Sequence, residues 1–340
     1  GGDAAYGLNH TLAWSLAAAA LALATDFDRD GYGLIAIARD AHPFDAALHP
    51  LALDVPGNGL DEDGFGGDLK LMPVPVQPGP AVLPKGSPNL IVVGMESTRA
   101  DALGKVVDGK AVTPVLNALA AGGSASRPAY SHVAFTTSSL KSIFSGALDP
   151  VPGSPSLFRD LKASGYRIGV FSGQPEDFGD ISATVAMREN ADVYVDAQAL
   201  KDKRAFGFAA QGSLLVDEKH LLAAFDRSFG KPADWRQPAF LYFNFQSPHF
   251  PYHHEGIVSR ITDQPIPRGA ISAANREWVS RTYYNAVASS DYWLGQLIAR
   301  LKALGVWDNT VLVVTGDHGE DLFEDGLLGH GHVISATQYA

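Results

Sequence analysis

Two segments of the chain bring metal-binding side chains to the ends of apolar runs. Residues 310–315 lead into Asp317 and His318, and residues 89–95 lead into Glu96. Apolar runs of this length predict buried β-strands, and open α/β sheets place their sites where the strands end. A carboxylate pair with an imidazole suits Zn²⁺ or Mn²⁺ better than an all-oxygen Ca²⁺ cage. We therefore predict one divalent metal centre at Glu96, Asp317 and His318, with Zn²⁺ or Mn²⁺ bound and Ca²⁺ as the alternative ion.

A third segment, residues 136–146, supplies a hydroxyl group for this centre. It predicts a short helix that Thr136 caps and Gly146 closes. A hydroxyl on a metal loses its proton more readily, which makes threonine a nucleophile at neutral pH. The positive end of the helix would also stabilise an anionic group under attack. Thr136 is therefore predicted to be a metal ligand and the nucleophile of phosphoryl or sulfuryl transfer.

The elements that must position these residues alternate between strand and helix. Strands are predicted at 89–95, 166–173, 191–195, 239–246 and 310–315, and helices at 113–123, 136–146, 156–165, 213–229 and 273–304. Continuous apolar strands separated by helices are typical of a sheet that is buried on both faces. We therefore predict an α/β fold with a mostly parallel central sheet and helices on both faces.

A proline-rich segment precedes this region and predicts a linker. Residues 72–88 contain six prolines, which are incompatible with regular backbone hydrogen bonding. The chain is therefore predicted to have a small loop-rich N-terminal segment, residues 1–71, and a catalytic domain, residues 89–340. Residues 8–25 are rich in alanine but interrupted by Asn9 and His10, which favours a packed helix over the end of a membrane helix.

The N-terminal segment carries most of the negative charge. Residues 26–68 hold ten acidic side chains against two arginines, in a chain with a net charge of −11. Asp26, Asp28 and Asp30 alternate and are followed by Gly31, a pattern typical of the start of a calcium loop. The segment resembles bacterial extracellular calcium-binding repeats. Calcium binding is therefore predicted here in preference to a solvated acidic loop.

Composition excludes several other functions. The acidic balance and the lack of a basic tract argue against a nucleic-acid partner. The chain has no cysteine, which excludes disulfides, cysteine zinc sites and a cysteine nucleophile.

Five segments occur in the order used by the alkaline-phosphatase superfamily: NLIVVGMESTRADALG, TPVLNALAAGG, TTSSLKSIFSG, FNFQSPHFPYH and TGDHGEDLFEDGLLGHGH. They resemble most the sulfatase-like branch that includes phosphoethanolamine transferases and lipoteichoic-acid synthases. The resemblance spans about residues 89–337, and it implies an alkaline-phosphatase-like fold that this chain truncates at its C-terminal end.

The resemblance also implies roles for individual residues. Glu96, Asp317 and His318 would be ligands of the first metal, and Thr136 would be the nucleophile. His249 would contact the substrate or a second metal. His330 would be the later site histidine, with His332 as the alternative. Sulfatases need a cysteine or serine at the nucleophile position to make formylglycine, so a threonine there favours phosphate-type esters.

We therefore predict a metal-dependent hydrolase or transferase of phosphate-type esters. Its substrate would be a small-molecule, lipid or glycan ester, and the parent protein would be extracytoplasmic, in the periplasm or cell envelope, either with or without a membrane anchor. Two alternatives stay open: a sulfuric ester hydrolase with an unconventional nucleophile, and a non-catalytic member that binds a lipid or a partner. Arg99 would contact an anion or pair with Asp101, and the acidic residues that follow His318 would form a solvated loop; these are Glu320, Asp321, Glu324 and Asp325.

Overall fold

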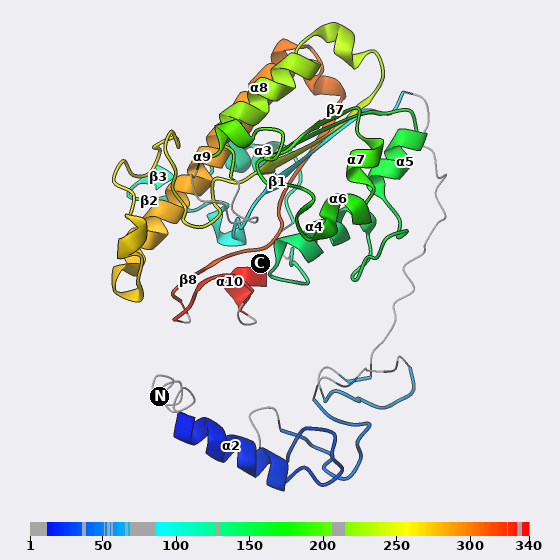
Figure 1. The fold of residues 1–340 in the computed structure, drawn as a ribbon, viewed down its shortest axis with the longest axis vertical. Coiled ribbons are helices and arrows are strands. Elements are labelled where there is room, and N and C mark those ends of the chain that lie inside the picture. The colour runs from blue at the N-terminus through cyan, green and yellow to red at the C-terminus, as the bar shows by residue number, and fades with distance from the viewer. Residues whose placement is uncertain are drawn as a thin grey trace. The chain divides into compact units, whose positions relative to one another are not determined.

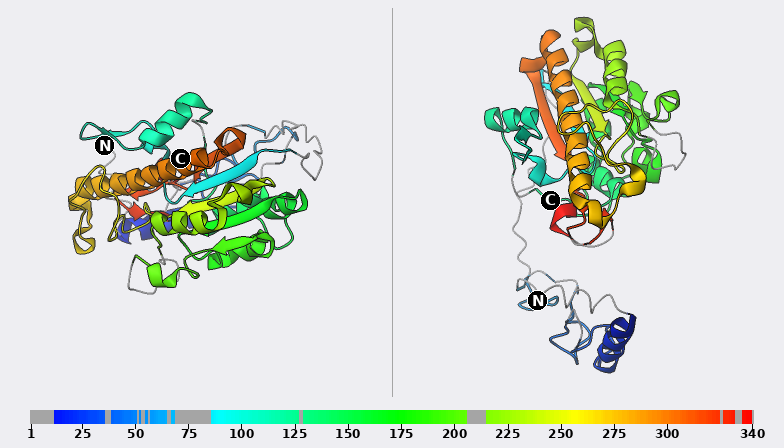
Figure 2. Two further views of the ribbon diagram at one scale, coloured as in Figure 1. Left: turned by 90° about the horizontal axis from the view of Figure 1, so that it is seen from above. Right: turned by 90° about the vertical axis from the view of Figure 1, so that its left-hand side faces the viewer.

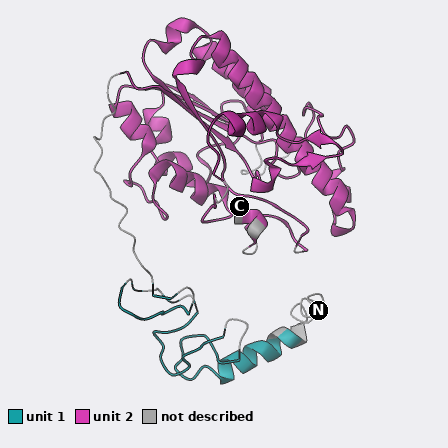
Figure 3. Ribbon diagram, turned by 180° about the vertical axis from the view of Figure 1, so that it is seen from behind, with its two compact units in different colours: residues 1–79 teal, residues 80–340 magenta. Residues whose placement is uncertain are grey.

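The computed structural model divides the chain into two compact units, residues 1–79 and 80–340 (Figure 3). It describes residues 12–35, 39–50, 52, 55, 57–64, 67–68, 86–126, 129–205, 215–324, 326–331 and 335–339. Residues 72–85 of the predicted linker lie outside this set.

The larger unit is built on a five-stranded parallel sheet, as the sequence predicted (Figure 1). The strands are β1 (Asn89–Met95), β4 (Arg167–Ser172), β5 (Val193–Val195), β6 (Ala239–Phe245) and β7 (Thr310–Gly316), in the order β5-β4-β6-β1-β7. In the register of the sheet, Met95 lies opposite both Phe245 and Gly316. The residues that follow β1, β6 and β7 therefore emerge side by side at one edge.

Helices cover both faces of this sheet (Figures 1 and 2). One face carries α8 (Glu218–Phe229) and α9 (Arg276–Ala303), and α3 (Pro114–Gly122) packs against α9. The other face carries α4 (Thr136–Ser145), α5 (Leu157–Ala163), α6 (Ile181–Thr184) and α7 (Met187–Asn190).

The side chains of the central strands alternate between two hydrophobic cores. On β1, Ile91 and Val93 join the core beneath α8 and α9, whereas Val92 joins the core beneath α4 and α5. This alternation is the two-residue period of a strand with both faces buried. It explains why these strands read as continuous apolar runs.

Strand β7 differs because it lies at the edge of the sheet. Val311 and Val313 are 47% and 43% exposed, while the other residues of β7 are partly buried. The strand nonetheless pairs with β1 along its whole length, from Asn89–Thr310 to Met95–Gly316.

The helix predicted at 213–229 begins later, at Glu218. Val216 instead forms an isolated bridge with Arg204, and the Asp217 side chain accepts a hydrogen bond from Lys219 N at 2.8 Å. An N-cap aspartate ends the upstream extension of a helix, so the apolar pattern alone placed this boundary too early.

The sequence did not predict several short elements. They are the hairpin β2 (Val106–Val107) with β3 (Lys110–Ala111), the hairpin β8 (Asp321–Leu322) with β9 (Leu328–Gly329), and the helices α6, α7 and α10 (Ala336–Tyr339). Each strand or helix in this group has two to four residues, and a segment that short shows no recognisable hydrophobic periodicity.

In the smaller unit, α2 (Leu12–Ala24) is largely exposed, so the prediction of a packed helix was wrong. Leu16 and Leu23 are 62% and 77% exposed. Among the described residues of this unit there is no other helix or strand for α2 to pack against. No helix within the described residues is both long and apolar enough to span a bilayer.

Candidate metal centre

The ends of β1 and β7 bring three predicted metal ligands together. Glu96 follows β1, and its backbone N–H donates to Phe245 O of the neighbouring strand at 2.9 Å. Ser97 N donates to Asp317 Oδ1 at 2.9 Å, which ties the loop after β1 to the loop after β7. Glu96, Asp317 and His318 are at most 3% exposed, and each offers a ligand atom within 4.8 Å of the others.

Helix α4 delivers the Thr136 hydroxyl to the same point. Its Oγ1 donates to Glu96 Oε1 at 2.9 Å and lies 3.1 Å from His318 Nε2. Thr136 is the first helical residue and does not cap the helix as predicted, because the N-cap is Phe135 and the hydroxyl is engaged by Glu96. Gly146 closes the helix as predicted, with a φ of 70°.

The carboxylates of Glu96 and Asp317 lie close together, which makes ionisation of Asp317 less favourable. Burial, and then the nearby charge of Glu96, raise the pKa of Asp317 to about 6. Asp317 Oδ1 accepts from Ser97 N and His318 N, whereas the buried Oδ2 has no hydrogen-bond partner within the described residues. An orphaned buried carboxylate oxygen beside a second carboxylate and an imidazole fits a divalent cation.

The His318 ring is held with one nitrogen facing this centre. Its Nδ1 lies 2.8 Å from Gly319 O, a carbonyl that can only accept, so Nδ1 carries the proton. Nε2 is then left to face Thr136 and Glu96, at 3.1 and 3.7 Å. This orientation is the usual one for a histidine that binds a metal.

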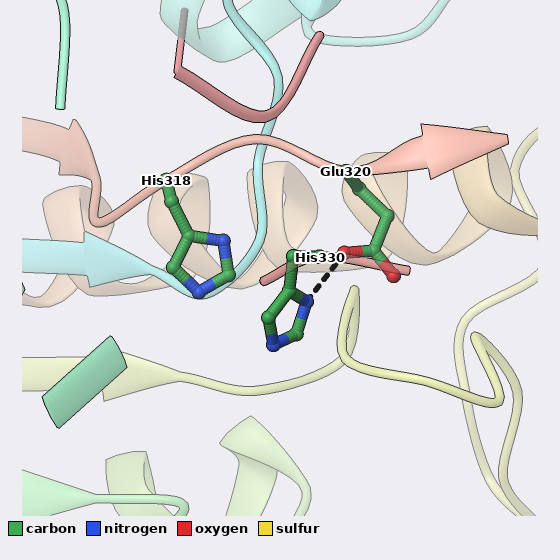
Figure 4. A group of neighbouring side chains, drawn as sticks. All are labelled: His318, Glu320 and His330. Atoms are coloured by element: carbon green, nitrogen blue, oxygen red, sulfur yellow. Dashed lines mark hydrogen bonds and ion pairs between the residues drawn. The ribbon is translucent and has the colours of Figure 1, made fainter. Parts of the chain in front are cut away.

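His330 lies beside His318, His249 lies near His330, and in all three rings Nδ1 lies close to an oxygen acceptor. The His330 ring centroid is 4.2 Å from that of His318, and Figure 4 shows these two rings with Glu320. The His249 ring centroid is 6.2 Å from that of His330. Nδ1 of His330 lies 2.7 Å from Glu320 Oε2, and Nδ1 of His249 lies 2.9 Å from Phe250 O. The acceptors hold the Nδ1 protons, and each of the three rings keeps its Nε2 for other partners.

The surroundings shift the pKa values of these two histidines in opposite directions. Burial opposes protonation of His330, but the hydrogen bond and charge of Glu320 outweigh it and raise the pKa of His330 to about 9. Burial lowers the pKa of His249. His332, the alternative to His330, lies outside the described residues.

The prediction that the acidic residues after His318 form a solvated loop was wrong for Glu320 and Asp321, which are fully buried. Hairpin β8–β9 and helix α10 fold back over them: Gly319 N donates to Gln338 O at 2.7 Å, and Gln338 Nε2 donates to Asp321 Oδ2 at 2.6 Å. The local sequence is polar and rich in glycine, so only this tertiary packing reveals the burial.

Arg99 pairs with carboxylates of this region. Its guanidinium lies 3.0 Å from Asp101 and 2.5 Å from Glu324, and the Arg99 side chain is 8% exposed. Of the two roles considered for Arg99, the structure therefore supports pairing. Asp325 lies outside the described residues.

Two further residues support the centre and were missed from sequence. Gln246, directly after β6, donates to Glu96 Oε2 at 3.2 Å and to Asn244 Oδ1 at 3.0 Å. Tyr283 of α9 donates its hydroxyl to Ser97 O at 2.7 Å. The position of Gln246 at the end of a predicted strand was a usable signal. Tyr283 fits the apolar pattern of α9, which conceals its polar contact.

In the smaller unit, the three alternating aspartates lie close together. Asp26, Asp28 and Asp30 have carboxylate oxygens within 4.8 Å of one another. Asp26 Oδ2 accepts from Gly31 N at 3.1 Å, and Gly31 has a φ of 96°, which glycine adopts readily. Each aspartate keeps one buried oxygen without a hydrogen-bond partner in the described part of the chain.

Comparisons with known proteins agree on one family. The family model described as Sulfatase matches residues 88–338. An endo-4-O-sulfatase of Bacteroides thetaiotaomicron is 28% identical over 118 residues, which cover 32% of this chain and 23% of that protein. The chain thus spans about a quarter of this curated relative.

Solved structures show the same fold. The lipoteichoic acid synthase LtaP of Listeria monocytogenes has a TM-score of 0.56 at 22% identity, covering 69% of this chain and 57% of that chain. The C-terminal periplasmic domain of phosphoethanolamine transferase EptC of Campylobacter jejuni has a TM-score of 0.54 at 16% identity, covering 74% of this chain and 76% of that chain. At these identities the similarity establishes a shared architecture.

Proposed function

Because this chain belongs to the sulfatase family, we propose that it is a metal-dependent hydrolase or transferase of phosphate-type esters with Thr136 as its nucleophile. The contact that carries the proposal is the buried Thr136 hydroxyl, 2.9 Å from Glu96 and 3.1 Å from His318. A hydroxyl placed between a carboxylate and an imidazole, at the N-terminus of a helix, suits attack on an anionic ester.

The residues that would hold the metal are Glu96, Asp317, His318 and Thr136. Zn²⁺ or Mn²⁺ suits this mixed oxygen and nitrogen donor set, with Ca²⁺ as the alternative. When bound, the metal lowers the pKa of the threonine hydroxyl and offsets charge on the ester. The partnerless Oδ2 of Asp317 supports this assignment.

The reaction would proceed in two displacement steps. In the first, Oγ1 of Thr136 bonds to phosphorus, the bond from phosphorus to the leaving oxygen breaks, and the hydroxyl proton passes towards Glu96. The N–H groups in the first turn of α4 stabilise the negative charge that develops. In the second, water or an acceptor hydroxyl bonds to phosphorus, the bond from phosphorus to Oγ1 breaks, and the proton held near Glu96 returns to Thr136. Hydrolysis and transfer differ only in this acceptor.

His330 and His249 would act on the oxygens of the ester through their Nε2 atoms. With its pKa near 9, His330 is protonated at neutral pH in the absence of a metal and can donate to the leaving oxygen. His249, whose pKa is lowered, is neutral and can accept a proton from the incoming hydroxyl.

A sulfuric ester hydrolase is the second candidate. The observation that favours it is the endo-4-O-sulfatase similarity over 118 residues. Thr136 argues against the formylglycine route, so a sulfate ester would require direct attack by threonine. A non-catalytic role in lipid or partner binding is the third candidate, and a turnover measurement separates it from the other two.

We further propose that Asp26, Asp28 and Asp30 bind Ca²⁺ and that the parent protein is extracytoplasmic and membrane-anchored. The partnerless oxygens of the three aspartates support the calcium site. The fold shared with a periplasmic domain supports the location. The substrate would then be a lipid, glycan or small-molecule phosphate ester of the cell envelope.

The test is to trap the nucleophile. Thr136→Ala should abolish turnover of a p-nitrophenyl phosphate diester, and mass spectrometry should find the phosphoryl group on Thr136 of the wild type. Ser142→Ala removes a hydroxyl from a half-buried position of the same helix, where it faces Leu148 O, and serves as the matched control. A covalent label on another residue, or turnover by Thr136→Ala, would refute the assignment. A sulfate ester tested in parallel decides between the first two candidates.

A further inference from the structure

The carboxylate of Glu320 connects three loops of the site. Glu320 itself lies in the loop after β7, two residues beyond His318. Its Oε1 accepts from the Tyr252 hydroxyl at 2.5 Å, and Tyr252 lies in the loop after β6 that carries His249. Its Oε2 accepts from Nδ1 of His330 at 2.7 Å, in the loop after β9.

The side chain of Glu320 is also shielded from solvent, and its backbone groups are hydrogen-bonded. Its side chain is fully buried. Its backbone N–H donates to Thr337 O at 2.9 Å, and its carbonyl accepts from Arg99 Nη1 at 3.2 Å. All the polar groups of this residue therefore have partners, and the carboxylate has little freedom to turn.

Two functions could explain such a residue, and the contacts favour one. The Glu320 carboxylate lies within 4.8 Å of a ring nitrogen of His318 and of His330, so it could serve as a metal ligand. However, both of its oxygens already accept hydrogen bonds, from Tyr252 and His330. A carboxylate occupied on both oxygens is better suited to orienting a histidine than to binding an ion.

We infer that Glu320 is a positioning residue for His330, an assignment that deepens the proposed function and rests on it. Glu320 holds the Nδ1 proton of His330, and Tyr252 fixes the carboxylate that does so. Figure 4 shows the His330 ring between Glu320 and His318, with its second nitrogen facing away from Glu320. Whether His330 is neutral or protonated, the atom presented to the substrate or the metal is therefore Nε2.

The inference predicts the effect of an isosteric change. Glu320→Gln removes the charge and lets an amide N–H face Nδ1, so the neutral ring can adopt the other tautomer. Loss of an orienting partner of this kind typically lowers activity or metal affinity by about 10-fold to 100-fold. Tyr252→Phe keeps the charge and the His330 bond but frees one carboxylate oxygen, so it should have a smaller effect in the same direction.

The neighbouring Asp321 provides a matched control. It is equally buried and is the first residue of β8, but its oxygens accept from Ser335, Thr337 and Gln338, and no hydrogen bond joins it to His330. Asp321→Asn should therefore disturb the packing of the hairpin without changing the tautomer of His330.

The experiment records long-range ¹H–¹⁵N spectra of the imidazole rings in the full chain at an alkaline pH where the His330 ring is neutral and has a defined tautomer. The His330 signal is assigned by its loss in His330→Gln. We expect a protonated Nδ1 in the wild type, a shift of the tautomer population in Glu320→Gln, and no shift in Asp321→Asn. Turnover of the phosphate diester should fall about 10-fold to 100-fold in Glu320→Gln. If Glu320→Gln does not fold, Glu320→Asp carries the test, because the shorter side chain withdraws the carboxylate from Nδ1 of His330.

Equal His330 spectra in the wild type and the Glu320 variant, or equal changes in the Glu320 and Asp321 variants, would overturn the inference. The ring spectra do not depend on turnover. An unchanged spectrum therefore overturns the positioning role alone, whereas failure to trap phosphate on Thr136 refutes the proposed function alone.

Discussion

Asp317→Asn should stabilise the metal-free protein and should gain much less stability from added metal than the wild type does. Burial, and then repulsion from Glu96, raise the pKa of Asp317 from an ordinary value of about 3.9 to about 6. A carboxyl whose pKa is raised on folding favours the folded state while it is protonated, and this advantage is lost as the pH rises from about 4 to about 6. At pH 7.5 the ionised group therefore costs the metal-free protein roughly 3 kcal/mol.

Asparagine avoids this cost because it is neutral and its amide oxygen can still accept from Ser97 N. At about 2 to 4 °C per kcal/mol for a domain of this size, the Tm of metal-free Asp317→Asn should exceed that of the wild type by about 6 to 12 °C at pH 7.5. Below about pH 4 the two proteins should have equal Tm values. Metal at about 100 times its Kd should add about 2.7 kcal/mol to the wild type and much less to the variant.

Thermal unfolding with a chelator and with added Zn²⁺ or Mn²⁺, across this pH range, measures both effects. Asp226→Asn is the control, since Asp226 forms an exposed ion pair with Arg300 at 3.0 Å that contributes at most about 1 kcal/mol. A metal-free variant that is less stable than the wild type at pH 7.5 would show that the two carboxylates do not repel each other as described. Equal stabilisation of both proteins by metal would remove Asp317 from the ligands.

Three further predictions follow from buried or clustered side chains. Tyr283→Phe leaves Ser97 O without its donor and should lower the free energy of unfolding by about 1 to 3 kcal/mol, as measured by denaturant titration. An unchanged free energy of unfolding would mean that water replaces the tyrosine as the donor to this carbonyl. Phe144→Ala opens a cavity in the core beneath α4 and should cost about 3 to 5 kcal/mol by the same measurement, and a cost below about 1 kcal/mol would contradict the packing. Asp28→Asn should weaken Ca²⁺ binding in isothermal titration calorimetry and leave the metal content of the larger unit unchanged; calcium affinity equal to that of the wild type would exclude the aspartate site.

The architecture of the larger unit could be predicted because the central strands β1, β4 and β6 are buried on both faces and β7, although partly exposed, is apolar as well. Such strands read as apolar runs, and their ends point to the sheet edge where Glu96 and Asp317 meet. Parallel pairing places the residue after each strand at the same level, which is why Glu96 and Asp317, 221 residues apart in the chain, could be assigned to one site.

The support of the site could not be predicted, since it depends on contacts between loops. Glu320 and Asp321 sit in a polar sequence that is typical of a solvated surface, and only the return of the chain through α10 buries them. Thr136 precedes a helical pattern, which predicts a cap. Its hydroxyl makes a different bond because Glu96 arrives from a strand 40 residues earlier. The residue pattern of one helix or strand carries no information on its contacts with residues from other elements.

Strand β7 supplies both Asp317 and His318, yet within the described chain β1 is its single hydrogen-bonded neighbour. A border strand detaches at lower free energy than a central one, and its detachment would carry away two ligands in one event. Dissociation of an ion from this centre and fraying of the sheet are therefore one coupled equilibrium, and a bound ion would protect the amides of β7 from hydrogen exchange.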